Sequence, residues 1–166
     1  MKKLLVTGLN GFVGCHLQAL IESMPGGPWQ LLASKPHDLL DCASLDTWLQ
    51  EECPDAVIHL AGQTFVPEAF RDPAQTIKVN LLGTLNLLQA LKRRGFCGTF
   101  LYVSSGDVYG QVMESDLPVV ETLAPQPRNP YAVSKVAAEL LCQQWSYNEP
   151  WRIIVARPFN HIGPGQ

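Results

Sequence analysis

The sequence predicts an α/β fold, a doubly wound parallel sheet with helices on both faces. Five short apolar segments alternate with helical patterns along the 166 residues, which favours parallel strands joined by right-handed crossovers. The first apolar segment, residues 3–6, is followed by three glycines spaced G-x-x-G-x-x-G and then by a helical pattern. A strand that turns through glycines into a helix is typical of a Rossmann-like domain that holds a phosphate at the helix N-terminus.

The glycine turn and the helix after it are the first elements to justify. Gly8 permits a tight turn, Gly11 lets the backbone approach a pyrophosphate, and Gly14 lets the helix pack close to the strand. The proline and glycine residues at 25–28 end the helix. Its apolar face is expected to consist of Val13, Leu17, Leu20, Ile21 and Met24.

The next segments continue the alternation. Residues 29–33 are expected to form a short second strand, and residues 55–62 a buried third strand that ends in small residues. Between them, Ser44 is a suitable N-cap for a short helix. A long helical pattern runs from Pro73 to Arg94, with the proline in its first turn.

The last third of the chain contains two more strands around a loop and a helix. Residues 99–105 and 152–157 are the expected fourth and fifth strands, and residues 131–147 are the expected helix. The polar, proline-rich segment 113–129 is too long for a simple connection and is therefore expected to be functional.

Composition excludes several classes of partner. A net charge of −3, with residues 92–94 as the densest basic run, argues against nucleic acid. No apolar run approaches the roughly 18 residues of a membrane span, and the apolar run at the start is too short for a signal peptide. Five scattered cysteines without C-x-x-C spacing predict reduced, buried thiols and a cytoplasmic location. The histidines show no metal-ligand spacing, so no metal is expected.

Small and polar residues gather where four predicted strands end. They are residues 8–14, 61–64, 104–107 and 157–160. In a doubly wound sheet the ligand lies beyond the carboxyl ends of the strands. The sequence therefore predicts one ligand site at this edge.

Tyr131 and Lys135 lie four residues apart at the start of a predicted helix, so they share one face. A free phenol has a pKa of about 10, and a nearby ammonium together with an oxidised nicotinamide would lower it. With a serine hydroxyl from the neighbouring strand, the pair would deliver a proton during hydride transfer.

Six motifs extend over nearly the whole chain. They are T-G-L-N-G-F-V-G at 7–14, H-L-A-G at 59–62, V-N-L-L-G-T at 79–84, S-S-G-D-V-Y-G at 104–110, Y-A-V-S-K at 131–135 and R-P-F-N-H-I-G-P-G at 157–165. With these motifs the chain resembles the extended short-chain dehydrogenase/reductase family that acts on nucleotide sugars. The resemblance implies NADP or NAD as cofactor and a Rossmann-like domain over residues 1–166.

The resemblance also implies residue roles. Tyr131 is the expected general acid, Lys135 lowers its pKa and binds the nicotinamide ribose, and Ser105 orients a keto oxygen. The implied substrate-binding residues are Ser105, Gly106, Asp107, Tyr131 and Asn160. The implied cofactor-binding residues are Gly8, Asn10, Gly11, Phe12, Val13, Gly14, Lys35, Asp38, Leu39, Leu60, Ala61, Gly62, Thr64, Asn80, Tyr131 and Lys135.

Within the family, residues 62–70, 104–110 and 159–166 are most similar to reductases of a GDP-linked 4-keto-6-deoxy sugar. Related 4,6-dehydratases carry an acidic pair or Ser-Glu after the catalytic Ser or Thr. Gly106 and Asp107 stand there in this chain, which disfavours dehydration and leaves 4-epimerisation open. Ser34 and Lys35 follow the second strand, where an acidic residue usually selects NAD, so NADPH is expected to serve at least as well as NADH unless Lys35 is only a solvated loop residue.

Family members are much longer than this chain, so it is expected to be their cofactor half without most of the substrate lobe. The helices from Pro73 and Tyr131 are expected to form the four-helix bundle of a homodimer, as in relatives. Two functions remain open, an NAD(P)H-dependent nucleotide-sugar reductase and a dinucleotide-binding module without catalysis.

Overall fold

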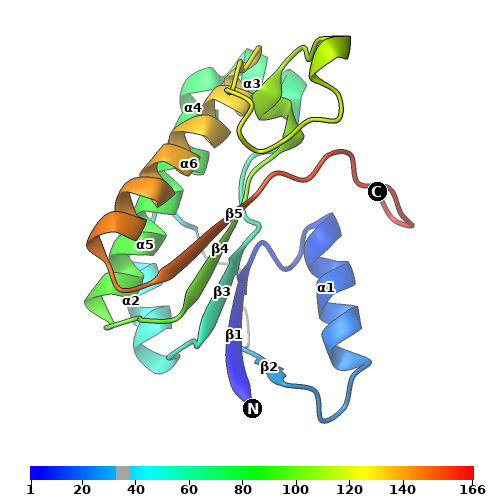
Figure 1. The fold of residues 1–166 in the computed structure, drawn as a ribbon. Helices are drawn as coiled ribbons and strands as arrows, with labels where there is room; N and C mark the ends of the chain where they lie inside the picture. Colours follow the sequence, from blue (N-terminus) through cyan, green and yellow to red (C-terminus); the bar gives the residue numbers. More distant parts are fainter. Residues whose placement is uncertain (33–37) are drawn as a thin grey trace.

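Five parallel strands form the centre of the fold (Figure 1). In this computed structural model, which describes residues 1–32 and 38–166, they lie in the order β2-β1-β3-β4-β5. Their bounds are Lys2–Thr7 for β1, Trp29–Leu31 for β2, Ala56–His59 for β3, Thr99–Val103 for β4 and Arg152–Ala156 for β5. The chain leaves β1 for β2 on one side and later enters β3 on the other, so the topological switch point lies between β1 and β3.

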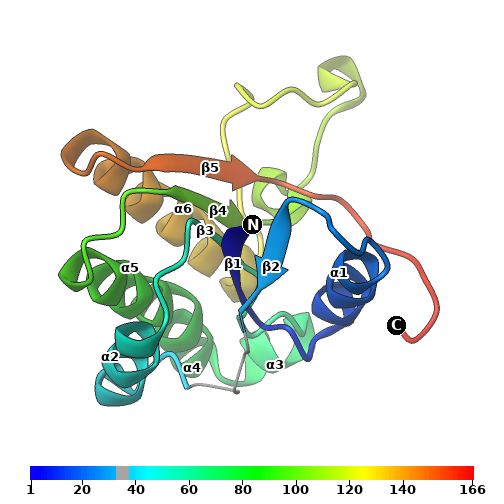
Figure 2. The same ribbon diagram turned by 90° about the horizontal axis from the view of Figure 1, so that it is seen from below.

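Helices cover both faces of the sheet, as the sequence predicts, but unevenly (Figures 1 and 2). Within the described ranges, α1 (Phe12–Glu22) is the only helix on its face. The opposite face carries α2 (Cys42–Glu51), α5 (Gly83–Arg93) and α6 (Pro130–Asn148). The larger core cluster lies between these three helices and the sheet, with Leu49, Leu88 and Cys142 packed near Val57 and Phe100.

The face of α1 is narrower than predicted. Leu17 and Ile21 pack on the small core cluster around Leu4 and Val6, whereas Leu20 and Met24 are 56% and 46% exposed. The prediction is wrong for these two residues, because the helix ends at Glu22, before Met24, and because Leu17 and Ile21 make its contact with the small core cluster.

The helix predicted from Pro73 to Arg94 is interrupted. It consists of α4 (Pro73–Ile77), a π-helical turn at Lys78–Leu82 and α5. A short helix before it, α3 (Val66–Arg71), was not predicted, because six residues are too few to show a helical period. The π turn matters for the site because isolated π turns often place side chains with a function.

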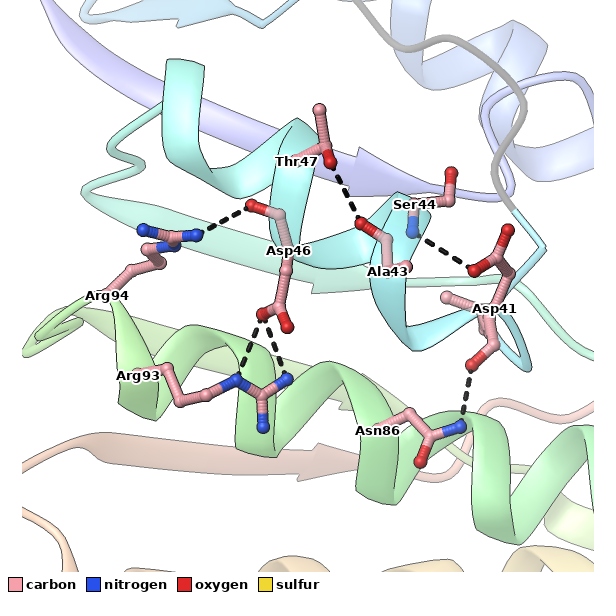
Figure 3. Close-up of polar contacts among 9 residues, drawn as sticks. Asp41, Ala43, Ser44, Asp46, Thr47, Asn86, Arg93 and Arg94 are labelled. Atoms are coloured by element: carbon pink, nitrogen blue, oxygen red, sulfur yellow. Dashed lines mark hydrogen bonds and ion pairs between the residues drawn. The ribbon is translucent and has the colours of Figure 1, made fainter.

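The N-cap of α2 is Asp41 rather than the predicted Ser44 (Figure 3). Oδ1 of Asp41 accepts a hydrogen bond from the backbone N–H of Ser44 at 3.1 Å. Farther along α2, Asp46 accepts hydrogen bonds from Arg93 through its carboxylate and from Arg94 through its backbone oxygen. These contacts fix α2 against α5 at the protein surface.

The segment 113–129 contains a 3₁₀ turn at Glu114–Asp116 and is otherwise irregular. The prediction of buried cysteines is wrong for four of the five. Only Cys142 is buried, whereas the other thiols lie on outward-facing or loop positions: Cys15, Cys42, Cys53 and Cys97. In the described part of the chain, no helix has the length and apolar character that a membrane span requires.

Candidate active site

The glycine turn joins β1 to α1 at the switch point. Gly8 has a φ of +75°, and a Cβ there would lie 2.7 Å from the backbone N of Ala61. A Cβ on Gly14 would lie 2.4 Å from the backbone oxygen of Gly8, so the glycine lets α1 approach the turn. No side chain caps the N-terminus of α1 and its first turn holds no acidic residue. Its N–H groups and its positive dipole end can therefore receive an anion.

A cleft of about 580 Å³ opens at the carboxyl ends of β1, β3, β4 and β5. Thirteen residues that the sequence analysis assigned to the site line it, namely Gly8, Gly11, Phe12, Val13, Gly14, Leu60, Ala61, Gly62, Thr64, Ser105, Tyr131, Lys135 and Asn160. Tertiary structure therefore brings the glycine turn and the Ser/Tyr/Lys set into one cavity.

The segment after β5 forms another wall of this cleft. It passes the ends of the strands toward α1 (Figure 1), and Pro158, Phe159 and His161 line the cavity beside Asn160. Nε2 of His16 on α1 lies 3.0 Å from the backbone oxygen of Pro164, which holds the end of the segment against that helix.

A second hollow, of about 330 Å³, shares Ala61 and Gly62 with the cleft. Asp38 and Leu39 line this second hollow, so both predicted residues lie next to the part of the cleft that Ala61 and Gly62 form. Asn10 is exposed in the turn and does not belong to either lining. Lys35 and its neighbour Ser34 fall outside the described residues.

Tyr131 stands in the first turn of α6. Asn129 caps this helix by accepting a hydrogen bond from the N–H of Ala132 at 2.7 Å. Burial raises the pKa of Tyr131, with a further contribution from the charge of Asp107, while a hydrogen bond with Ser105 acts in the opposite direction. Burial dominates, so the net shift of this pKa is upward, and the expectation that Lys135 and an oxidised nicotinamide together lower it stays a prediction. The phenol is protonated at neutral pH, which suits a proton donor.

Lys135 lies one turn farther along α6 and is 4% exposed. Its Nζ donates a hydrogen bond to the backbone oxygen of Val103 at 2.9 Å and lies 5.8 Å from the ring centre of Tyr131. A Cβ on Gly62 would lie 3.9 Å from this Nζ, so the ammonium faces the loop after β3. Burial lowers the pKa of Lys135 to about 8, although the nearby charge of Glu139 raises it.

Asn80 in the π turn is 3% exposed and lies behind the cleft wall. Its Oδ1 accepts from the N–H of Gln63 at 2.7 Å, and its Nδ2 donates to the backbone oxygen of Gln63 at 2.9 Å and to Oγ of Ser134 at 2.8 Å. The amide thus joins the loop after β3 to α6. This arrangement gives Asn80 a bracing position instead of a place in the lining.

Gly106 and Asp107, both predicted to contact substrate, lie beside the cleft without lining it. A Cβ on Gly106 would lie 2.7 Å from the ring of Phe159. Asp107 accepts a hydrogen bond from the side chain of Asn129 at 3.2 Å, and its N–H donates to Oγ of Ser105 at 3.2 Å. Asp107 therefore links the Ser105 turn to the cap of α6.

Six of the lining residues have no assigned role in the sequence analysis, among them Ser104 and Phe159. Ser104 is 4% exposed, and its Oγ is buried without a hydrogen-bond partner. Phe159 is 62% exposed and stacks on Tyr109 with ring centres 6.3 Å apart. Their signal was present in the sequence, since both lie at a strand end that was predicted to form the site.

Comparisons with known proteins agree with this geometry. Residues 4–166 match the model of the "NAD dependent epimerase/dehydratase family". The chain is 68% identical to the GDP-6-deoxy-D-mannose reductase of Pseudomonas aeruginosa over 99% of its own length and 54% of that protein. It therefore spans about half the length of this curated relative.

Solved structures show the same relationship. The structure of RMD from Pseudomonas aeruginosa complexed with NADPH matches all of this chain and 56% of its own, with a TM-score of 0.95 and 67% identity. The UDP-glucose 4-epimerase of Thermus thermophilus, in complex with NAD, matches 93% of this chain and 54% of its own, with a TM-score of 0.83 and 31% identity. This chain belongs to the NAD dependent epimerase/dehydratase family.

Proposed function

We propose that residues 1–166 act as the NAD(P)-binding domain of a nucleotide-sugar reductase and carry its catalytic Ser105, Tyr131 and Lys135. The proposed reaction reduces the 4-keto group of GDP-4-dehydro-6-deoxy-D-mannose to give GDP-D-rhamnose, with NADPH or NADH as the reductant. The observation that carries the proposal is the meeting of the glycine turn and these three side chains in one cleft. The 68% identity to a GDP-6-deoxy-D-mannose reductase supports the choice of substrate.

The residues of the cleft fit an NAD(P) cofactor. The uncapped N-terminus of α1 suits the pyrophosphate, and the hollow beside Asp38 and Leu39 suits the adenosine end. At the other end of the cleft, the Lys135 ammonium has N–H donors left for the hydroxyls of the nicotinamide ribose after its bond to Val103. A bound reduced nicotinamide supplies the hydride that the carbonyl carbon of the substrate accepts.

Tyr131 and Ser105 account for the remaining proton. Ser105 donates a hydrogen bond to the keto oxygen and holds it beside the phenol. As negative charge develops on this oxygen, Tyr131 donates its phenolic proton, and the C–O⁻ group becomes an alcohol. Lys135, above the ring of Tyr131, then stabilises the phenolate that remains.

Two further candidate functions use the same cleft. The Ser/Tyr/Lys set also serves 4-epimerisation, and the chain is 31% identical to a UDP-glucose 4-epimerase in complex with NAD. An epimerase would interconvert two sugars without net consumption of the reduced cofactor. Because the chain spans about half of its relatives, binding of the cofactor without turnover is the other candidate.

The same proposal includes a homodimer through the helices that start at Pro73 and Pro130. Apolar side chains on this part of the surface support it, since Ile77, Leu82 and Val133 are each more than one third exposed. Light scattering of the protein as it elutes from a size-exclusion column should give twice the mass of one chain. A Leu82→Glu variant should then elute as a monomer.

The deciding experiment measures oxidation of NADPH and NADH by the chain in the presence of GDP-4-dehydro-6-deoxy-D-mannose. Tyr131→Phe should abolish turnover and keep cofactor affinity. Tyr147→Phe is the matched control, because Tyr147 lies at the other end of α6 and is 75% exposed. Cofactor binding without turnover would favour the binding module, and absence of both would contradict the assignment of the cleft.

A further inference from the structure

Glu139 is a buried carboxylate that the proposed mechanism does not use. It lies on α6 four residues after Lys135, so the two side chains share one face of the helix. Glu139 is 7% exposed and Lys135 is 4% exposed. A lysine and a glutamate with this spacing can form a direct ion pair, and in a buried setting such a pair would be strong.

In the structure, each member of this pair has another partner. Arg157, which follows β5, donates from Nε to both carboxylate oxygens of Glu139 at 3.0 and 3.1 Å, and from Nη2 to Oε2 at 2.7 Å. Lys135 instead donates to the backbone oxygen of Val103. The guanidinium fork thus binds both oxygens of a carboxylate that lies one helical turn after Lys135.

Arg157 is itself held in place from three sides. Its Nη1 donates to the hydroxyl of Tyr109 at 3.0 Å and to the backbone oxygen of Glu121 at 3.2 Å. Its guanidinium carbon also lies 5.0 Å from the ring centre of Tyr109. The fork therefore has a fixed orientation toward Glu139, and an exposed, unsupported arginine would not have one.

The other titratable groups that act on Lys135 are uncharged at neutral pH. Burial lowers the pKa of His59 on β3 to about 3 and raises the pKa of Cys142 on α6 to about 12. Burial also raises the pKa of Tyr102 on β4 and of Tyr131 on α6. Among these neighbours, the carboxylate of Glu139 is thus the charge that competes with the cofactor for the ammonium.

We propose that Arg157 is a positioning residue that holds both carboxylate oxygens of Glu139 away from Lys135 and so leaves the ammonium directed at the cofactor cleft. This inference rests on the proposed function, in which Lys135 binds the nicotinamide ribose. If Arg157 has a purely structural role, as a tie between α6, Tyr109 and the 113–129 loop, removal of the Glu139 carboxylate should not restore NADPH binding. The two roles separate when the carboxylate is removed together with the arginine.

The test compares Arg157→Met, Glu139→Gln and the double variant. NADPH affinity is measured by fluorescence at mildly acidic pH, where Lys135 keeps its proton in all variants, and the pKa of Lys135 is followed by the ¹³C shift of its ε carbon. Arg157→Met should weaken NADPH binding about tenfold, the size of one redirected charged hydrogen bond, and should raise the pKa of Lys135. The double variant should recover affinity to within a few-fold of the unchanged chain.

The result that overturns the proposal is a double variant that binds NADPH no better than Arg157→Met, or an unaltered pKa of Lys135 in Arg157→Met. If Arg157→Met does not fold, Arg157→Lys and Arg157→Lys/Glu139→Gln give the same comparison with a cation retained. The surface pair of Arg93 and Asp46 (Figure 3) is the control, because Arg93→Met with Asp46→Asn removes an arginine–carboxylate pair whose residues do not line the cleft. If the unchanged chain binds no NADPH, the proposed function fails. The pKa of Lys135 in the variants then still shows whether Arg157 keeps the Glu139 carboxylate away from Lys135.

Discussion

The hydroxyl of Thr7 at the end of β1 lies 2.6 Å from Nδ1 of His59 at the end of β3, and this buried contact joins the two strands between which the cleft opens. On the other side of the ring, Nε2 lies 3.0 Å from Oγ1 of Thr84. Thr84 donates its own proton to the backbone oxygen of Asn80 at 2.6 Å, so it accepts from Nε2–H. The network thus assigns the neutral Nε2–H tautomer, with Nδ1 accepting from Thr7.

This relationship predicts acid sensitivity. Burial, followed by the charge of Lys135, lowers the pKa of His59 from 6.5 to about 3. Between these two values the unfolded chain binds a proton that the folded chain does not, so the free energy of unfolding falls by several kcal/mol as the pH falls through this window. Urea unfolding at several pH values across this range should show the fall in the free energy of unfolding. In His59→Gln this free energy should depend less on pH. His16→Gln, at an exposed histidine, is the control variant.

Gly8 and Gly26 allow a controlled test of close packing at the turn. Both have a positive φ, +75° and +78°, so alanine has the same backbone strain at each. A Cβ on Gly26 meets open space, whereas one on Gly8 would lie 2.7 Å from the N of Ala61. We expect Gly26→Ala to lower the free energy of unfolding by about 1 kcal/mol and Gly8→Ala by about 3 kcal/mol or more, with loss of NADPH binding. Equal effects in chemical denaturation would contradict the close approach.

Asn80 should act as a brace. Asn80→Ala leaves the backbone groups of Gln63 and the hydroxyl of Ser134 without their partner, which costs about 2–3 kcal/mol of unfolding free energy. Asn86→Ala is the control, since Asn86 makes one hydrogen bond, to the backbone oxygen of Leu39, and should cost about 1 kcal/mol. If Asn80 serves only as a cofactor contact, its replacement would weaken NADPH binding and leave the denaturation midpoint in place.

Gly106 should be required for the position of the Phe159 ring. A Cβ at 106 would lie 2.7 Å from Cδ1 of this ring, and the ring is exposed enough to rotate away. We therefore expect Gly106→Ala to cost about 1 kcal/mol of unfolding free energy and to break the stacking of Phe159 on Tyr109. In a Phe159→Ala background the same change should cost almost nothing. A double-mutant cycle with no coupling between the two positions would disprove the clash.

The alternation of apolar strands and helices, with the G-x-x-G-x-x-G turn, was enough to predict the fold class and most of the residues that line the cleft. These features are local, because a strand, a turn and a helix each leave a period or a special residue in the sequence. They also indicate the sheet edge, since the carboxyl ends of parallel strands lie together.

Other features depended on contacts between residues far apart in the chain. The amide of Asn80 could be assigned to the cofactor from its motif, but its pairing with Gln63 and Ser134 follows from the π turn, which has no signature in the sequence. The pKa of Tyr131 is raised rather than lowered because burial, a property of the folded chain, outweighs its hydrogen bond with Ser105. Arg157 and Glu139 meet only when β5 and α6 pack together. The sequence by itself determined the five strands, the longer helices and the sheet edge at which the strand ends meet. Tertiary structure decided the short helix α3, the π turn, charge, protonation and hydrogen-bond partners, because these depend on desolvation and on distances between separate elements.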